Sequence, residues 1–580
     1  MFQAFSLMSY DSEEVIFKET ILNAYKYKKA NTKIVTQKIF AYYPELRKEA
    51  KRLLPKIQEK VEEINSYSWE KIEEIVTNNY SEDIEIEEKK RDYLPEMKDA
   101  VKGKVKVRYP PEPSKAPHIG QMLSFCINHL VAERYEGKRV LRFDDTNPDT
   151  VKSEFYDQFR DAISWLGLPI DEEIIASNHM NTYYIKAREM LENDQAYVCK
   201  CDRETMTKLR SEQKRCSCHI NHSNEKNIEL FEKILENNFS PGEVVIRLKG
   251  DMGSQNSALK DPVLLRISDT PHCLQGDKYI LWPMYDFESP IMEHITKVTH
   301  IFRSIEFGKM REELQQTIAK RLGLNIPKIY EYSRFNIVGA PTKGRVIREL
   351  VEKGIVSGWD DIRLVTYQAL KKRGIQPQTI TEIIKKVGTT KSTTTIDWSL
   401  INAINRKIIE PTTKHFFFVR NPIKIDIINP EKITKEISVH PYNSSLGTRE
   451  INIYSRLYLD GDDSQFIQPG KILRMKDLYN IKIIEQKGLG EFEAEVLGNE
   501  ILTDVKKIQW VSEPVNVYVK KADMLYLNNG INKDSLKFIQ GYGEKHLREL
   551  EVGSIVQLER FGYVIITDKN YKISMNYIHG

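Results

Sequence analysis

Cysteine and long apolar runs are the two features this chain has least of. Its 580 residues include six cysteines, too few for the disulfide framework of a small secreted protein. No stretch approaches the roughly 20 apolar residues that a membrane-spanning helix requires. The segment Met1 to Tyr10 has no basic stretch followed by a long apolar core, so no secretory signal is expected. These absences exclude a disulfide scaffold and a membrane protein, and they predict a cytoplasmic protein.

An excess of charge of one sign is also missing. The 87 basic residues nearly balance the 83 acidic ones, which leaves a formal net charge of +4. Net charge therefore does not indicate a nucleic-acid-binding protein, and a basic surface would have to arise from local segregation of charge. Internal repeats and low-complexity tracts are not visible. The length indicates roughly three to five domains with large cores.

The most informative segment lies between Val107 and Pro148. It begins V-R-Y-P-P-E-P-S-K-A-P-H-I-G-Q, continues with apolar residues at helical spacing, and ends in V-L-R-F-D-D-T-N-P. This pattern predicts a strand, a helix that starts near His118 and Gly120, and a second strand that ends in two carboxylates. A glycine at a helix start lets a nucleotide approach the backbone, where exposed N–H groups favour phosphate. Strand, helix and strand in this order indicate a doubly wound α/β site.

This segment resembles the first signature region of class I aminoacyl-tRNA synthetases, in the glutamyl and glutaminyl branch. The pattern of that branch is close to R-F-P-P-E-P-S-G-x-L-H-I-G-H, followed by L-R-F-D-D-T-N-P. Further similar strings are G-W-D-D-I-R from Gly358, N-R-K-I-I-E-P from Asn405 and E-R-F-G from Glu559. The resemblance covers almost the whole chain. Its β-rich end is similar to the archaeal and eukaryotic glutamyl type, since bacterial glutamyl enzymes end in helices.

The resemblance and the changes in sequence texture predict a multidomain fold that combines α/β and all-β parts. A helical domain (1–97), whose densely charged end is expected to act as a linker, precedes a Rossmann-type catalytic domain (98–330). The catalytic domain holds an insertion at about 198–278. A helical stem-contact region (331–395) carries the second signature loop. Period-2 alternation then predicts two β-barrels (396–580) that bind the anticodon.

The resemblance implies that glutamate is activated with ATP to glutamyl-adenylate and then transferred to the 3′ end of tRNA(Glu). This reaction needs positioning and neutralisation of phosphate charge more than covalent chemistry by side chains. In such a site, the catalytic residues at the first signature would be His118, Gly120 and Gln121, the last in place of the family's second histidine. The alternative for His118 is a buried histidine at a strand–helix junction. The ATP-binding set implied by the resemblance is Glu112, Pro113, Ser114, His118, Gly120, Arg334, Phe335 and Lys343.

The second signature of the family, close to M-S-K-R-K, is altered here. It aligns with Thr342-Lys343-Gly344-Arg345-Val346, which puts a glycine where the catalytic lysine stands. We expect Lys343, assisted by Arg345, to stabilise the departing pyrophosphate together with Mg²⁺. The first signature departs as well, because Lys115 replaces a glycine. The alternative hypothesis is a synthetase-like paralogue that binds tRNA or a nucleotide without normal charging.

A glutamate substrate requires cations for its two carboxylates and an anion for its ammonium group. By the resemblance, Arg108 and Arg303 supply bidentate donors, Asp144 takes the ammonium, and Tyr285 donates a hydroxyl. Glutaminyl enzymes typically carry a cysteine in place of Arg303, and the arginine therefore favours glutamate. A glutaminyl-tRNA synthetase stays a second alternative, and charging of tRNA(Gln) in addition to tRNA(Glu) stays open.

Four of the six cysteines stand close together in the insertion. Their C-x-C pairs have the type and spacing of a structural zinc site, and the predicted ligands are Cys199, Cys201, Cys216 and Cys218. The fourth ligand is open between Cys218, His219 and His222. The alternative is four reduced thiols without a metal.

Binding of tRNA is expected to use phosphate contacts and splayed anticodon bases. The candidate residues are Arg406, Lys407, Trp510 and Arg560, and ordinary surface charge is the alternative for each. The expected partners are tRNA(Glu), glutamate and ATP, without a membrane. The chain is expected to be a monomer that can bind a protein partner through its N-terminal helices. These helices resemble the extension of archaeal-type glutamyl enzymes, and an unrelated helical adaptor is the alternative.

Overall fold

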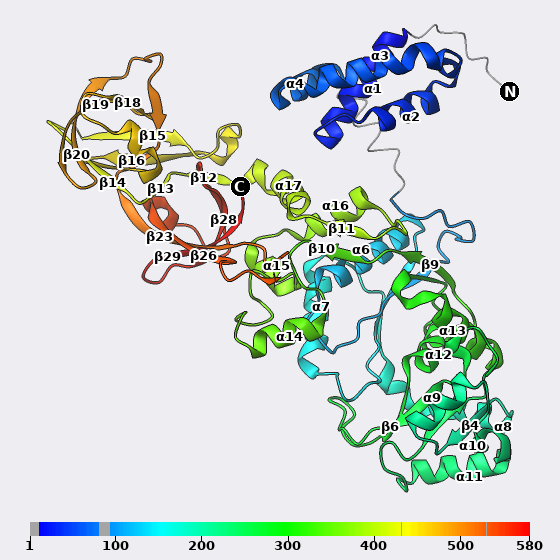
Figure 1. Ribbon diagram of the computed structural model, residues 1–580. Coiled ribbons are helices and arrows are strands. Elements are labelled where there is room, and N and C mark those ends of the chain that lie inside the picture. Colours follow the sequence, from blue (N-terminus) through cyan, green and yellow to red (C-terminus); the bar gives the residue numbers. More distant parts are fainter. Residues whose placement is uncertain (1–10, 81–92, 431, 529) are drawn as a thin grey trace. The chain divides into compact units, whose positions relative to one another are not determined.

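The computed structural model describes residues 11–80, 93–430, 432–528 and 530–580. The chain forms two compact units, the first ending at Tyr93 and the second beginning at Leu94 (Figure 1). Most of the charged segment predicted to be a linker, 81–92, lies outside the described residues. Within the described ranges, no helix has the length and apolar character needed to cross a bilayer.

The first unit is a small helical bundle, which confirms the predicted helical domain. Its helices are α1 (Ser12–Tyr27), α2 (Thr32–Tyr42), α3 (Ala50–Asn65) and α4 (Trp69–Asn79), with a 3₁₀ turn at Pro44–Glu49. Side chains of Asp11, Asn31 and Ser68 cap the starts of α1, α2 and α4 by accepting backbone N–H groups. The helical repeat of α3 places Leu53 and Ile57 in the core, where neither is exposed.

The second unit opens with the predicted Rossmann-type sheet. Its parallel strands are β1 (Lys106–Tyr109), β2 (Lys138–Phe143) and β3 (Glu172–Ile175), and a second parallel pair is β8 (His300–Ser304) and β9 (Lys328–Tyr332). The N–H of Thr299 donates to the carbonyl of Lys106 at 2.9 Å, which places β8 beside β1. The strand order is therefore β3–β2–β1–β8–β9. The connecting helices are α6 (Ile119–Arg134), α7 (Ser153–Trp165), α12 (Tyr285–Thr296) and α13 (Gly308–Arg321).

The insertion is a four-stranded antiparallel sheet with helices on it. The strands are β4 (Ala196–Cys199), β5 (Val245–Leu248), β6 (Val263–Ile267) and β7 (Leu281–Pro283). The helices are α8 (Met180–Glu192), α9 (Arg203–Ser211), α10 (Ser217–Asn221) and α11 (Asn224–Leu235). Trp282 on β7 lies in one apolar core with Ile291 of α12 and Ile318 of α13. The insertion therefore packs against the catalytic half, and β7 leads directly into α12.

The stem-contact region is largely helical, and its helical character extends further than predicted. Its elements are α14 (Gly344–Glu352), α15 (Tyr367–Arg373), α16 (Pro377–Val387) and the parallel strands β10 (Phe335–Ile337) and β11 (Thr394–Ile396). A further helix, α17 (Trp398–Ile409), occupies the point where the barrels were expected to begin. Apolar residues at helical spacing, Ile401, Ile404 and Ile409, are buried on it. The β part therefore starts at β12.

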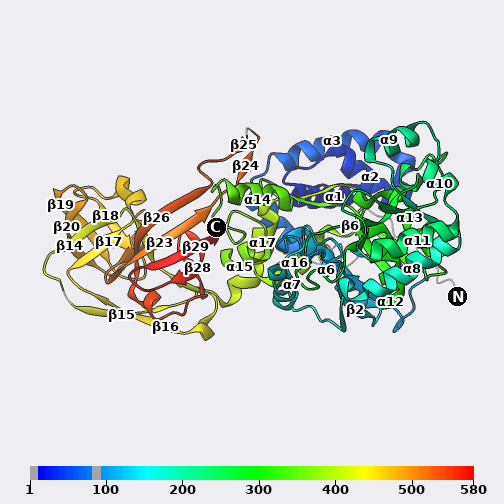
Figure 2. The ribbon, with the colours of Figure 1, turned by 90° about the horizontal axis from the view of Figure 1, so that it is seen from below.

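The β part consists of two seven-stranded sheets (Figures 1 and 2). In order across the first sheet lie β12 (Lys414–Phe416), β27 (Ile555–Leu558), β28 (Gly562–Asp568), β29 (Ile573–His579), β23 (Pro514–Ala522), β26 (Leu536–Glu544) and β13 (Phe418–Arg420). The second contains β21 (Lys506–Ile508), β18 (Ile472–Met475), β19 (Asn480–Gly488), β20 (Glu491–Gly498), β14 (Ile423–Ile427), β17 (Arg456–Leu459) and β22 (Trp510–Val511). A separate hairpin is formed by β15 (Ile433–Ser438) and β16 (Thr448–Ile453).

Each sheet is rolled toward a barrel, because its two edge strands are neighbours in sequence. Only Phe417 separates β12 from β13, and only Gln509 separates β21 from β22. Where the edge strands β12 and β13 of the first sheet follow one another, Glu544 accepts the N–H of Phe417 at 2.5 Å and the Nε–H of Arg449 at 2.6 Å. Both charged side chains are 3% exposed. A buried ion pair thus fixes the rolled edge of this sheet against β16.

A hairpin of β24 (Tyr526–Leu527) and β25 (Gly530–Ile531), between β23 and β26 of the first sheet, extends to α14 (Figure 2). Leu525 is fully buried in one cluster with Ile347 and Leu350 of α14. The N–H of Tyr526 donates to the carbonyl of Gly339 at 3.0 Å. The barrel part therefore supports the helix that carries the second signature.

The two-unit division predicts separable stability. Ile57→Ala should lower the unfolding free energy of the first unit by about 2–5 kcal/mol, because it leaves a cavity in a small core. Calorimetry of the full chain should show one transition displaced and the other unchanged, and the exposed Glu59→Ala on the same helix should displace neither. Equal displacement of both transitions would contradict the division.

Candidate active site

A cavity of about 690 Å³ lies at the carboxyl ends of the parallel strands, where ligands bind in doubly wound sheets. Its wall combines the first signature, the segment after β2, the start of α12, the end of β8 and the second signature loop. Among the predicted site residues, those that line it are Arg108, Glu112, His118, Gly120, Gln121, Asp144, Tyr285, Arg303, Arg334, Phe335 and Lys343. The fold thus gathers the predicted glutamate set and most of the predicted ATP set.

His118 is the N-cap of α6, with its imidazole turned back on the helix start. Its Nδ1 accepts the N–H of Gly120 at 3.1 Å. A side chain on Gly120 would crowd this ring, since an added Cβ would lie 3.0 Å from its Cε1. Burial, together with the nearby charges of Lys115 and Arg334, lowers the pKa of His118 to about 3. The ring is therefore neutral at physiological pH, with its proton on Nε2 available for donation.

Gln121 completes a capping box at the same helix start. Its Oε1 accepts the N–H of His118 at 3.2 Å, three residues earlier in the chain. The amide Nε2 remains as a neutral donor on the cavity wall. A glutamine at this position therefore keeps the helix start intact, although it brings no charge to the cavity.

A buried network of charges forms the floor of the end of the cavity that holds the predicted glutamate-binding residues. Arg108 on β1 donates to Glu293 on α12, with 2.5 Å between Nε and Oε1. Arg142 on β2 holds Asp144 with two hydrogen bonds of 2.5 and 2.9 Å. Its Nη1 also lies 3.2 Å from Glu293. Burial raises the pKa of Glu293, but Arg108 and Arg142 outweigh it and lower the pKa overall. Arg108 is therefore already paired with Glu293, and Asp144 with Arg142, inside the protein.

Sequence reasoning missed three members of this floor: Arg142, Glu288 and Glu293. Arg142 stands inside the quoted R-F-D-D string, and the two glutamates interrupt the apolar face of α12; these were the available signals. Glu288 is fully buried, and neither carboxyl oxygen has a hydrogen-bond partner in the described part of the chain. Burial and the charge of Asp144 raise its pKa well above the usual range. The direction of this shift favours the protonated, neutral form of Glu288.

Arg303, at the end of β8, is 5% exposed and faces the cavity. Its two terminal nitrogens donate to Gln315 at 3.1 Å and to Glu312 at 3.0 Å. Its Nε is buried and has no partner within the described residues. Tyr285, at the first position of α12, also lines the cavity. Arg311, which pairs with Asp286, is a further lining cation that sequence reasoning missed.

The second signature loop borders the end of the cavity that holds the predicted ATP-binding residues. Arg334 donates to Glu306 at 2.9 Å and to Thr342 at 3.0 Å, and Phe335 stacks on Tyr332. Lys343 is the exposed N-cap of α14 and lines the cavity. Arg345 is exposed on α14, outside the lining residues. Pro113 and Ser114 also lie outside this lining: their carbonyls accept the N–H of Lys152 and the guanidinium of Arg348.

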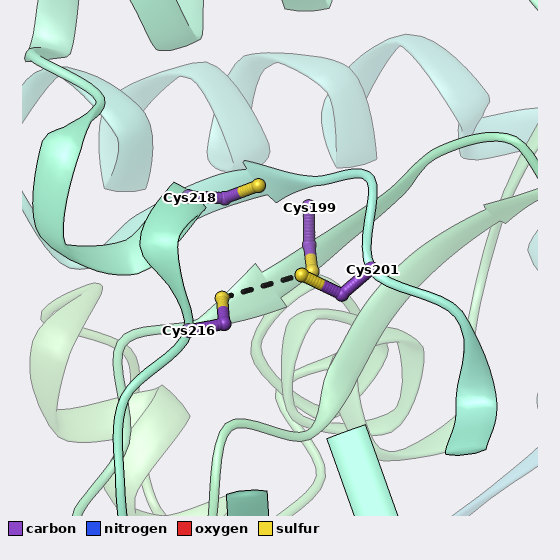
Figure 3. Close-up of side chains that lie close together, drawn as sticks. All are labelled: Cys199, Cys201, Cys216 and Cys218. Carbon is purple, nitrogen blue, oxygen red and sulfur yellow. Dashed lines mark hydrogen bonds between the residues drawn. The ribbon is translucent and has the colours of Figure 1, made fainter. Parts of the chain in front are cut away.

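The four cysteines of the insertion converge as predicted (Figure 3). Cys199 and Cys201 come from the end of β4, and Cys216 and Cys218 from the start of α10. All four sulfur atoms lie within 4.8 Å of one another, with Cys199 and Cys216 4.0 Å apart. His219 does not join them, because its Nδ1 bonds to Asp261 at 2.6 Å. Four sulfur donors in one cluster fit a closed tetrahedral zinc site.

The predicted tRNA-binding residues do not form one group. The prediction that Trp510 binds tRNA is wrong, because its side chain is fully buried in the core of the second sheet. Its indole N–H donates to the carbonyl of Lys476 at 2.9 Å. A base cannot stack on it. Arg406 and Lys407 are exposed on α17 and not on a barrel strand. Arg560, between β27 and β28, forms an ion pair with Asp463.

Comparisons with known proteins agree with this architecture. A family model described as "tRNA synthetases class I (E and Q), catalytic domain" matches residues 104–411. Two models described as "tRNA synthetases class I (E and Q), anti-codon binding domain" match residues 414–498 and 507–567. The first match ends just after α17, and the other two lie within the part of the chain that forms the two rolled sheets.

Curated relatives match over nearly the full chain. A "Glutamate--tRNA ligase" from Nitrosopumilus maritimus is 37% identical and covers 98% of this chain and 99% of its own length. One from Thermococcus kodakarensis is 36% identical, with 96% and 97% covered. Among solved structures, a glutamate tRNA ligase from Elizabethkingia meningosepticum aligns over 53% of this chain and 70% of its own, at 19% identity and a TM-score of 0.40.

The two buried glutamates of α12 should respond oppositely to neutralisation. Glu293→Gln should lower the unfolding free energy by about 3 kcal/mol or more, because Arg108 and Arg142 then lose a buried counter-charge. Glu288→Gln should leave the Tm unchanged or raise it, since a carboxyl with a raised pKa opposes folding as pH rises above its unfolded value. Thermal unfolding at pH 7 measures both variants. A loss at Glu288→Gln as large as at Glu293→Gln would show that Glu288 is ionised.

Proposed function

The chain belongs to the class I (E and Q) tRNA synthetases, and on this premise we propose that it is a glutamate–tRNA ligase. It activates glutamate with ATP to form glutamyl-adenylate and pyrophosphate, and transfers the glutamyl group to the 3′ end of tRNA(Glu). The observation that carries this function is the full-length similarity to glutamate–tRNA ligases. Neither the paralogue nor the glutaminyl alternative receives support from the relatives.

The cavity supports glutamate as the amino acid. The buried Nε of Arg303 is an unsatisfied cationic donor, and such groups normally have a partner in a folded protein. A substrate carboxylate would satisfy it with a charge-assisted hydrogen bond, which is stronger than one to the neutral oxygen of a side-chain amide. The network under the cavity holds Arg108 and Asp144 in fixed positions, which supports charge recognition by preorganised groups.

The nucleotide end supports the activation step. The α-carboxylate of glutamate attacks the α-phosphorus of ATP, and the bond to the bridging oxygen breaks, so that pyrophosphate leaves with the electron pair. The start of α6 presents backbone N–H groups where phosphate is favoured. Neutral His118 donates from Nε2, and Gln121 from its amide. Mg²⁺ would enter with the ATP phosphates and needs few protein ligands.

Acylation of tRNA requires that the molecule also hold the anticodon end. The two rolled sheets match anticodon-binding domains, and this supports tRNA as the partner. Arg406, Lys407 and Arg560 remain candidate contacts, and Trp510 is withdrawn because it is buried. A cytoplasmic location, a monomeric state and a protein partner for the first unit stay predictions.

Glutamate selectivity should depend on Arg303. Arg303→Cys should lower kcat/KM for glutamate by about 10²-fold or more, because a substrate carboxylate would then be buried without its cation. Aminoacylation with labelled glutamate, ATP, Mg²⁺ and tRNA(Glu) measures this change. Arg160→Ala, an arginine on α7 outside the cavity lining, is the control and should charge like the parent. If Arg303→Cys charges glutamate as the parent does, the amino-acid pocket has been misplaced.

The cysteine cluster is proposed to hold one structural zinc ion. Four thiolates would close the coordination shell and leave no position for a substrate, and zinc would therefore stabilise the insertion without taking part in the reaction. The four cysteines are sufficient, because His219 is engaged by Asp261. This assigns the ligand that the sequence left open to Cys218.

Metal analysis of the purified protein should find about one zinc per chain. Cys216→Ser should lose the metal, and Cys126→Ser should keep it, because Cys126 is buried beside Thr381 outside the cluster. Thiol titration under native conditions provides a second readout, since bound thiolates react slowly. Metal-free protein with four freely reacting thiols would contradict the site.

A further inference from the structure

Seven lysine and arginine side chains line the cavity, and their pairing differs. Five are arginines with a carboxylate partner: Arg108, Arg266, Arg303, Arg311 and Arg334. The other two are Lys115 and Lys343, whose side chains form no hydrogen bond or ion pair with any residue that the structure describes. Lysine ammonium groups without an internal partner in a ligand cavity are available to an anionic ligand. The sequence analysis assigned stabilisation of the departing pyrophosphate to Lys343, assisted by Arg345, and did not consider Lys115.

Lys115 occupies the space above Gly344. A Cβ added to Gly344 would lie 2.6 Å from Cδ of Lys115 and 3.2 Å from its Cβ. Any side chain at position 344 would therefore displace the Lys115 side chain. The two positions share one volume, and in this chain the lysine reaches it from the first signature loop instead of the second.

The surroundings of Lys115 favour an anion. The starts of α6 and α14 both border the cavity, through Gly120 and Gly344, and helix starts carry partial positive charge. Burial lowers the pKa of Lys115, Glu112 opposes this, and Arg334 lowers it further. The charge of Lys115 in turn helps to lower the pKa of His118. Positive groups are thus concentrated in one place, and the negative charge of a phosphate group would compensate them.

Contacts with α14 and with the start of α15 hold the segment around Lys115 in place. Arg348 on α14 donates to the carbonyl of Ser114 at 3.3 Å, directly before Lys115. His118 pairs with Thr366, and the N–H of Ile119 donates to the carbonyl of Val365 at 2.8 Å. Lys343, in contrast, is exposed, whereas Lys115 is only partly exposed. Lys115 is therefore the better positioned of the two lysines.

We propose that Lys115, and not Lys343, is the main catalytic cation that neutralises the pyrophosphate leaving group, and that Gly344 is small in order to admit it. This inference rests on the proposed glutamate–tRNA ligase activity. As glutamyl-adenylate forms, the electron pair of the broken phosphorus–oxygen bond stays on pyrophosphate. The Lys115 ammonium compensates that charge without transferring a proton. One explanation then covers both altered signatures. The first signature carries the lysine in place of its glycine, and the second carries the glycine in place of its lysine.

The test is glutamate-dependent exchange of pyrophosphate into ATP, measured on the full chain in the presence of tRNA(Glu). Lys115→Ala should lower kcat about 10²-fold or more, because one electrostatic contact to a developing charge is lost. The KM for glutamate and the affinity for tRNA should change little. Lys343→Ala should cost clearly less. Lys353→Ala, an exposed lysine at the far end of α14, is the control and should match the parent.

A rescue variant separates catalysis from folding. Lys115→Ala combined with Gly344→Lys refills the shared volume from the other loop and should recover activity to within about tenfold of the parent, since the same charge returns to the same place. Recovery would exclude a merely structural role for Lys115. Failure of the double variant, or a loss at Lys343→Ala larger than at Lys115→Ala, would overturn the proposal. If the parent itself shows no exchange, the proposed activity has failed first.

Discussion

The buried charges of Arg108, Arg142, Asp144 and Glu293 are the constraint on which the catalytic half depends. They connect the ends of two parallel strands to α12, and removing Arg142 or Glu293 would leave another buried charge unpaired. Desolvation makes such a network expensive, and it persists where geometry must be fixed. Here the fixed geometry is that of Arg108 and Asp144, which line the cavity directly above. Recognition of a charged amino acid therefore begins with ion pairs internal to the protein.

The nucleotide end follows a different principle. Its cations are not paired off in the same way, and two helix starts and two lysines meet around an open volume. This region requires a positive charge at a particular position in the cavity, and the lysine that supplies it can come from either signature loop. Gly344 and Lys115 illustrate the difference, because the loop that loses the lysine gains the room for a lysine from the neighbouring loop. Two substitutions that each look damaging in isolation become compatible with one another.

The β part is held to the catalytic part by its own extensions. The hairpin that begins near Leu525 packs on α14, and Asn576 on β29 donates to the carbonyl of Lys372 at 2.9 Å at the end of α15. Each sheet is rolled by a chain that leaves one edge and enters the other within one residue, at Phe417 and Gln509. Long-range strand pairing of this kind leaves only a weak local signal in the sequence, and the helix α17 was accordingly assigned to the barrels.

The sequence by itself determined the helical first unit, the Rossmann-type core, the insertion with its four cysteines, and most residues of the cavity, because local periodicity and contiguous motifs encode them. Tertiary structure alone decided which polar residues pair. Glu293 and Arg142 are 151 residues apart in the chain, so no local pattern could join them, and Trp510 carries the composition of a base-stacking residue but the burial of a core residue. The proposal of Cys218 as the fourth zinc ligand depends on the bond between His219 and Asp261, which only the folded chain forms. Lys115 was visible from the start as an unusual residue, but the volume it shares with Gly344 exists only once the two loops are folded against each other.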